Sequence, residues 1–227
     1  MLWLAFIFFI QIPNVVLCQE HNLLQSSLNL QPSIVTIKAF NIKTSNKANS
    51  KIKISGIEHQ GNGVIIDSSG IIVTNNHIID GAKYIIVTLS DGSVSNASVL
   101  YTGQTDFCFL KISTSRPLKA IAQANFSQIK NGDHIIALLE HQPLLSGTIA
   151  HLINEDEDTT SIAFLELNLD LHPGDSGGAI FSEQGCLLGL IMAQKKSDTQ
   201  KSYAISFQKI WKEYQRFNGS VLINTDQ

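Results

Sequence analysis

The chain has 227 residues, a formal net charge of −3 and 44% hydrophobic residues, and only 15% of its residues are charged. Because it has no basic excess, it lacks the charge pattern of a nucleic-acid-binding protein, and its hydrophobicity excludes an intrinsically disordered chain. The length allows one or two domains, since an all-β domain often runs to about 200–250 residues.

The first 18 residues contain no charged side chain and predict a secretory signal peptide. The apolar run over residues 2–10 is too short for a membrane-spanning helix, which needs about 20 apolar residues. The expected cut lies before Gln19, so that residues 19–32 form an N-terminal extension of a secreted or periplasmic protein. The positively charged start of a typical signal peptide is missing, which leaves a retained N-terminal anchor as the alternative.

Removal of residues 1–18 would leave two of the three cysteines, Cys108 and Cys186. Two cysteines do not build a disulfide scaffold. They either form one bridge or are two small buried apolar side chains, and the second interpretation is preferred. The chain has no CxxC or HExxH pattern, so no metal site and no cofactor are expected.

From residue 33 onward, short β-branched runs are separated by turn residues, which predicts many short strands. The expected strands are 33–40, 63–66, 71–74, 84–89, 94–101, 107–112, 134–139, 146–152, 161–169, 179–181 and 187–193. Because helices do not alternate with these strands, the pattern favours an all-β sandwich or barrel over a parallel α/β sheet. Polar residues 41–60 predict a surface loop, and two barrel-like halves would meet near 113–130.

One helix is predicted near the C-terminus, with Ser206 as its N-cap. An apolar stripe at helical spacing, which we interpret as core packing, consists of Phe207, Ile210, Trp211, Tyr214 and Phe217. Residues 218–227 are expected to be a C-terminal tail.

The segment HPGDSGG, residues 172–178, is the most informative string in the chain. A serine on a tight glycine-rich turn can expose its hydroxyl while neighbouring backbone N–H groups turn inward to stabilise an oxyanion. Ser176 is therefore a candidate nucleophile, and the N–H groups of Gly174 and Ser176 are candidate oxyanion donors. The alternative is an ordinary glycine-rich turn.

A nucleophilic serine needs a base, and the base needs a carboxylate that orients it. His77 follows the expected strand 71–74, and Asp106 stands at the entry of the apolar strand 107–112. The order His77, Asp106, Ser176 along the chain is that of chymotrypsin-like enzymes.

Residues 61–82, 105–112 and 172–180 resemble the three signature blocks of HtrA/Deg-type trypsin-like serine proteases. The resemblance runs from about residue 33 to about residue 206 and implies a protease domain over 33–217. It implies two antiparallel six-stranded β-barrels with the active site in the cleft between them, and protein or peptide substrates.

The resemblance also implies a role for each candidate residue. His77 would be the base, Asp106 the residue that orients it, and Ser176 the nucleophile. Gly174 and Ser176 would donate to the oxyanion.

Three departures from the family pattern refine these expectations. Only 51 residues follow Ser176, so no PDZ domain and no PDZ-mediated partner are expected, and the oligomeric state stays open. Asp175 stands where HtrA proteins usually have Asn, and we expect it to be hydrogen-bonded locally. Asp170 lies six residues before Ser176, at the pocket-floor position of trypsin-like enzymes, where it would favour Lys or Arg at the cleavage site.

The alternative for Asp170 is a position outside the pocket, with a preference for small apolar residues. His172 is either a second pocket residue or a simple loop histidine.

The preferred function is an exported serine endopeptidase that works through an acyl-enzyme. A non-catalytic binding protein on a protease fold and a membrane-anchored quality-control protease are the alternatives.

Overall fold

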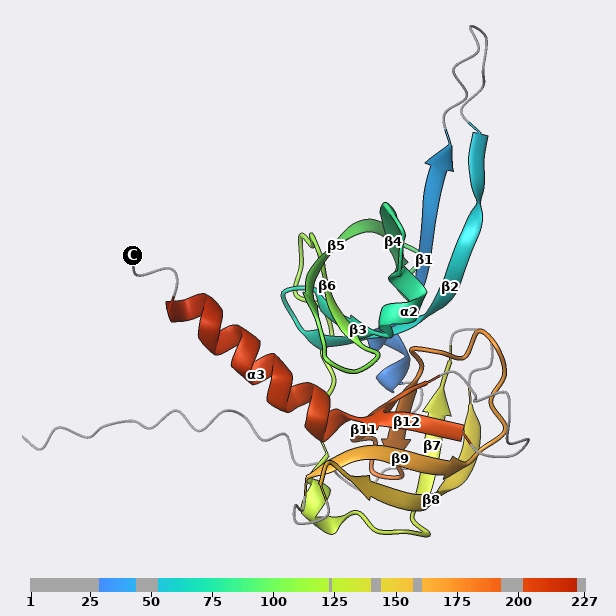
Figure 1. Ribbon diagram of the computed structural model, residues 1–227, viewed down its shortest axis with the longest axis vertical. Coiled ribbons are helices and arrows are strands. Elements are labelled where there is room, and N and C mark those ends of the chain that lie inside the picture. The colour runs from blue at the N-terminus through green and yellow to red at the C-terminus, as the bar shows by residue number, and fades with distance from the viewer. Residues whose placement is uncertain are drawn as a thin grey trace, which may run out of the picture.

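The computed structural model describes residues 29–43, 53–122, 124–139, 144–156, 161–192 and 202–223. The expected signal peptide and its cleavage site lie outside the described residues. The described part of the chain is mostly strand, with one long helix at its C-terminal end (Figure 1).

The first six strands form a closed antiparallel barrel. They are β1 (Ile34–Lys43), β2 (Lys53–Asp67), β3 (Ile71–Thr74), β4 (Tyr84–Thr88), β5 (Val94–Thr102) and β6 (Cys108–Ile112). The strand order is β1-β2-β3-β6-β5-β4, and pairing of β1 with β4 closes the barrel. Alternate residues of β1, including Val35 and Ile37, point into the barrel core, as the period of two in a strand requires.

The second six strands form another closed antiparallel barrel. They are β7 (His134–Leu138), β8 (Leu145–Asn154), β9 (Ile162–Asn168), β10 (Ala179–Ser182), β11 (Leu187–Ile191) and β12 (Ser202–Ser206). The strand order is β10-β11-β12-β9-β8-β7, and pairing of β10 with β7 closes the barrel. The expectation of two six-stranded barrels is therefore confirmed. The strand β12 is an addition, because residues 202–206 were not among the expected strands.

Residues 41–60 do not form the surface loop that their polar composition predicted. The structure places 41–43 in β1 and 53–60 in β2, while 44–52 lie outside the described residues. Figure 1 shows the two strands projecting together beyond the first barrel. Ile42 of β1 pairs with Ile54 of β2 among polar neighbours, and this pairing is not apparent from the local composition.

The barrels share an apolar core. The largest cluster of buried side chains combines Val64 and Phe107 from the first barrel with Leu138 and Phe181 from the second. Tyr214 from the C-terminal helix belongs to the same cluster. The barrels are therefore packed against each other rather than tethered by a linker alone.

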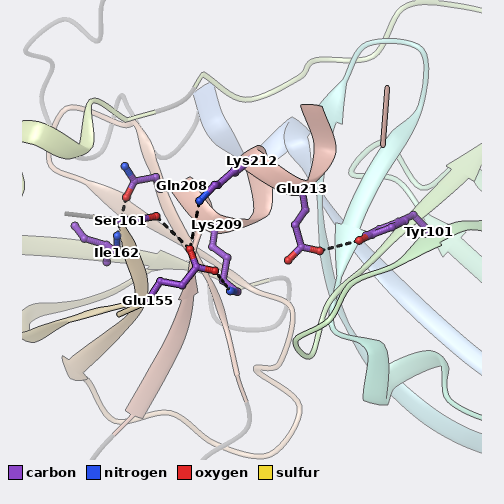
Figure 2. Close-up of polar contacts among 8 residues, drawn as sticks. All are labelled: Tyr101, Glu155, Ser161, Ile162, Gln208, Lys209, Lys212 and Glu213. Atoms are coloured by element: carbon purple, nitrogen blue, oxygen red, sulfur yellow. Dashed lines mark hydrogen bonds and ion pairs between the residues drawn. The ribbon is translucent and has the colours of Figure 1, made fainter. Parts of the chain in front are cut away.

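The C-terminal helix α3 (Phe207–Ile223) contacts both barrels (Figure 2). Lys209 Nζ lies 2.7 Å from Glu155 Oε1, just after β8 of the second barrel. The Tyr101 hydroxyl on β5 of the first barrel donates to Glu213 Oε2 at 2.9 Å. The predicted cap is confirmed, because the Ser206 hydroxyl accepts from the Gln208 N–H. The helix continues to Ile223, six residues beyond its expected end at residue 217.

The two cysteines of the described residues differ in state. Cys108 is a buried free thiol, as expected, whereas Cys186 is disulfide-bonded. The interpretation of two unbridged thiols is therefore wrong for Cys186, and the cysteines are not bridged to each other.

Within the described ranges, no helix is both long and apolar enough to cross a membrane. The same ranges contain no group of three or more His, Cys, Asp or Glu side chains that could hold a metal ion.

Candidate active site

His77 and Asp106 come together at one end of the first barrel. His77 lies in the single-turn helix α2 (Asn76–Ile79), which directly follows β3, and Asp106 lies just before β6. His77 Nδ1 is 2.7 Å from Asp106 Oδ2, and the His77 backbone N–H donates to Asp106 Oδ1 at 2.9 Å. Both carboxylate oxygens are therefore held by one histidine.

This contact determines which ring nitrogen of His77 carries the proton. A carboxylate can only accept, so Nδ1 is the donor and Nε2 of the neutral ring is left as an acceptor. The side chains of His77 and Asp106 are 42% and 28% exposed, so the ring stays accessible from outside.

The backbone around Asp106 is fixed by further contacts. The Asn75 side chain donates to the Asp106 carbonyl oxygen at 2.9 Å. Phe107 is fully buried, and a Cβ on Gly103 would overlap its ring, so the approach to β6 packs tightly around that ring. The Asp106 carboxylate is thus attached to a rigid segment.

The adjacent Cys108 thiol stays neutral. Burial, together with the negative charge of Asp106, raises the pKa of Cys108 to about 12. Cys108 is therefore not a competing nucleophile near neutral pH.

Ser176 lies on a turn built from consecutive hydrogen bonds. The Asp175 N–H donates to the His172 carbonyl, and the Gly178 N–H donates to the Asp175 carbonyl, both at 3.0 Å. Gly174 and Gly177 have φ of +105° and +80°, values that favour glycine. The hydroxyl-bearing residue Ser176 is only 6% exposed.

The turn leaves two N–H groups for another partner. In a trans peptide unit the C=O and N–H point in opposite directions. Because the Asp175 carbonyl points at Gly178, the Ser176 N–H points away from the turn's own hydrogen bonds. Among the contacts between described residues, neither this N–H nor that of Gly174 donates to a backbone carbonyl.

The turn that carries Ser176 lies in the second barrel and contacts β2 of the first. The Asn62 N–H donates to the Ser176 carbonyl at 2.9 Å, and the Asn62 side chain donates to the carbonyls of Gly174 and Ser176. The Thr74 hydroxyl, three residues before His77, donates to the Asn62 carbonyl at 2.7 Å. No hydrogen bond joins the Ser176 hydroxyl to the His77 ring, although both residues are described. Such bonds are often long in free enzymes.

The remaining candidate residues lie at the edge of the turn. Asp170 and His172 are both exposed. The local hydrogen bond expected of Asp175 is confirmed, because its carboxylate accepts from the His172 N–H at 2.6 Å.

Sequence reasoning did not single out Asn62, Thr74 or Asn75. All three are buried and polar. Asn62 contacts the turn, Thr74 contacts Asn62, and Asn75 contacts the Asp106 backbone. Asn62 does stand between two glycines, which is the one local signal that a neighbouring backbone comes close.

Sequence comparison relates the chain to trypsin-like peptidases. The family model of the trypsin-like peptidase domain matches residues 61–190. The periplasmic serine endoprotease DegP of Escherichia coli is 31% identical over 137 residues, which cover 57% of this chain and 29% of DegP. The serine protease Do-like HtrA of Lactococcus lactis is 31% identical over 166 residues, which cover 66% of this chain and 40% of the relative.

A solved structure has a similar fold. The HtrA-type protease AlgW, solved with a decapeptide, superposes with a TM-score of 0.70 at 20% identity, over 88% of this chain and 68% of AlgW. The chain spans less than half the length of the two sequence relatives. Because the family model covers more than half of the chain, the chain belongs to the trypsin-like peptidase domain family.

Proposed function

We propose that the chain is an exported serine endopeptidase that hydrolyses peptide bonds through His77, Asp106 and Ser176. The observation that carries the proposal is the double contact of the Asp106 carboxylate with the His77 ring and backbone. This contact leaves Nε2 as a proton acceptor, which is the state that a general base requires.

In the proposed acylation step, Ser176 Oγ attacks the carbonyl carbon of the scissile peptide bond. His77 Nε2 takes the hydroxyl proton, and the carbonyl π electrons move to the oxygen. Asp106 stays ionised and stabilises the imidazolium that forms. His77 then gives its proton to the leaving amine as the C–N bond breaks, which leaves an acyl-enzyme on Ser176.

The proposed oxyanion hole consists of the N–H groups of Gly174 and Ser176. Donors placed in advance lower the barrier because they need no reorganisation when charge develops on the oxygen. The orientation of the Ser176 N–H away from the hydrogen bonds of its own turn supports this role. A water molecule activated by His77 then hydrolyses the acyl-enzyme and restores Ser176.

Export is proposed from the uncharged N-terminal segment, residues 1–18. The relative DegP of Escherichia coli is a periplasmic protein, which agrees with export of this one. The N-terminal sequence of the mature protein tests the proposal: a start at Gln19 supports a cleaved signal peptide, and an intact Met1 supports the membrane-anchored alternative.

The substrate class is proposed to be proteins or peptides, with the cleavage preference set near Asp170 and His172. A positional-scanning peptide library tests whether Asp170 selects basic residues. Cleavage after Lys or Arg that is lost in Asp170→Asn supports the pocket hypothesis, whereas cleavage after Val or Ala rejects it.

The catalytic proposal is tested with Ser176→Ala. The variant should fold normally, lose all hydrolysis of the best library peptide and lose labelling by a fluorophosphonate probe. Ser127→Ala, at an exposed serine, is the matched control and should keep both properties. Unchanged turnover in Ser176→Ala would refute the assignment. A folded wild-type protein that neither hydrolyses nor labels would instead favour the non-catalytic binding protein.

A further inference from the structure

We propose that Asn62, on β2 of the first barrel, is a positioning residue. It would shape the turn over residues 172–178 of the second barrel, which carries the proposed nucleophile Ser176. The inference rests on the proposed function, because it assigns Asn62 a part in forming the proposed oxyanion hole. Asn62 would act through the backbone of residues 174–177 and would not touch the substrate.

The first observation is the hydrogen bonding of the Asn62 side chain. It is 3% exposed, and its Nδ2 donates to Gly174 O at 3.0 Å and to Ser176 O at 3.3 Å. Within the Asn side chain only the NH₂ group can donate to a carbonyl oxygen, so the amide nitrogen must face the turn. The backbone N–H of Asn62 adds a third bond, to Ser176 O at 2.9 Å.

These bonds hold the two peptide units that flank the unit between residues 175 and 176. Gly174 O belongs to the unit between residues 174 and 175, and Ser176 O to the unit between 176 and 177. The unit enclosed between them carries the Ser176 N–H, a proposed oxyanion donor. Because each peptide unit is planar, fixing both neighbours restricts the rotation of the enclosed unit.

The packing around Asn62 leaves little freedom for the turn to move. A Cβ on Gly177 would overlap the Asn62 carbonyl oxygen, and a Cβ on Gly61 would lie 2.9 Å from Ser176 O. Glycines on both sides of the contact therefore let the two backbones meet. The approach is too close for any side chain at these two positions.

Asn62 also connects the turn to the segment that carries the base. Its carbonyl accepts from the Thr74 hydroxyl at 2.7 Å, and Thr74 is followed by Asn75, which holds the Asp106 backbone. Asn62 thus stands between the Ser176 turn in one barrel and the His77–Asp106 pair in the other. The relative placement of nucleophile and base depends on this residue.

The experiment compares Asn62→Ala and Asn62→Asp with the wild type. Each is measured per folded molecule on the best library peptide, with circular dichroism and thermal unfolding as folding checks. The trifluoromethyl ketone analogue of that peptide serves as a probe of the oxyanion hole. Ser176 adds to its carbonyl, and the resulting oxyanion needs the same donors as the acylation step.

A positioning role predicts a specific combination of effects. In Asn62→Ala, kcat should fall about 10- to 100-fold, less than the roughly 10²–10³-fold lost when an oxyanion donor itself is removed. The affinity for the trifluoromethyl ketone should fall by a similar factor, while KM for the peptide stays within about threefold, because ground-state binding does not use the oxyanion hole.

Asn62→Asp separates hydrogen bonding from packing. The aspartate has the same shape but presents acceptors to the two carbonyl oxygens, so its kcat should be no higher than that of Asn62→Ala. If Asn62 only filled space, the aspartate variant would keep near wild-type kcat. If Asn62→Asp does not fold, Asn62→Ala decides the matter alone.

Tyr101→Phe is the matched control, because it removes a hydrogen bond between distant parts of the chain without touching the turn (Figure 2). It should keep the kcat and the analogue affinity of the wild type. The inference is overturned if folded Asn62→Ala keeps kcat within threefold, or if its KM alone changes. Failure of the proposed function would look different, because the wild type itself would then be inactive or Ser176→Ala would stay active.

Discussion

The contact between Asp106 and His77 makes the outcome of Asp106→Asn predictable. Asn has one acceptor oxygen where Asp has two, and the His77 backbone N–H, 2.9 Å from Oδ1, requires an acceptor. The Asn oxygen must therefore take the Oδ1 position, which turns the NH₂ group toward His77 Nδ1. Two donors cannot face each other, so the ring has to move its proton to Nε2.

A histidine protonated at Nε2 cannot accept the proton of Ser176. We expect kcat to fall about 10⁴-fold, the loss known for this exchange in a serine-protease triad, which corresponds to about 5.5 kcal/mol of barrier. Because the two side chains have the same shape, the free energy of unfolding should change by about 1–2 kcal/mol at most.

The assay is kcat and KM on the best library peptide, together with chemical denaturation of both proteins. Asp133→Asn is the control, because the Asp133 carboxylate accepts a backbone N–H in an exposed loop far along the chain. A folded Asp106→Asn protein with kcat within tenfold of the wild type would refute the tautomer argument. A large loss of stability would show instead that Asp106 holds the fold rather than the ring.

Further substitutions test the turn that carries Ser176 and the contact of Glu155 with the C-terminal helix. Gly177→Ala should abolish most activity, because φ is +80° and the new Cβ would overlap the Asn62 carbonyl. Gly92→Ala, at φ +81° with nothing within 4 Å, should cost only the roughly 1–2 kcal/mol of strain and leave kcat/KM unchanged. Equal effects of the two in unfolding and kinetic assays would contradict the overlap. For Glu155, the hydrogen bond and charge of Lys209 lower the pKa below the ordinary 4.5. Its stabilising contribution is therefore present above that pH and is lost as the pH falls through the folded-state value. Glu155→Gln should flatten the acid side of the pH–stability curve measured by denaturation, and an unchanged slope would remove Glu155 as its source.

Much of the fold is predictable from short-range patterns. Turn signals such as Asp67 to Gly70 separate β-branched runs, and β3, β4 and β5 begin at the expected residues, whereas β2 begins ten residues before its expected start. The strand β12 was missed because it is five residues long and has a serine at each end. Its extended form depends on pairing with β9 and β11, which no local pattern encodes.

The candidate site is only partly encoded in local sequence. His77, Asp106 and Ser176 stand in short motifs whose chemistry is recognisable. Asn62 lies within the signature block 61–82, but its role is not apparent there, because its partners lie 112 and 114 residues away, in the other barrel.

The shared core has a consequence for how the molecule unfolds. Tyr214 of α3 joins the apolar cluster that contains side chains from both barrels. Because one cluster serves both barrels and the helix, we expect them to lose their structure together, in a single cooperative transition on heating. The proposed nucleophile and base come from different barrels, so activity should be lost in that same transition.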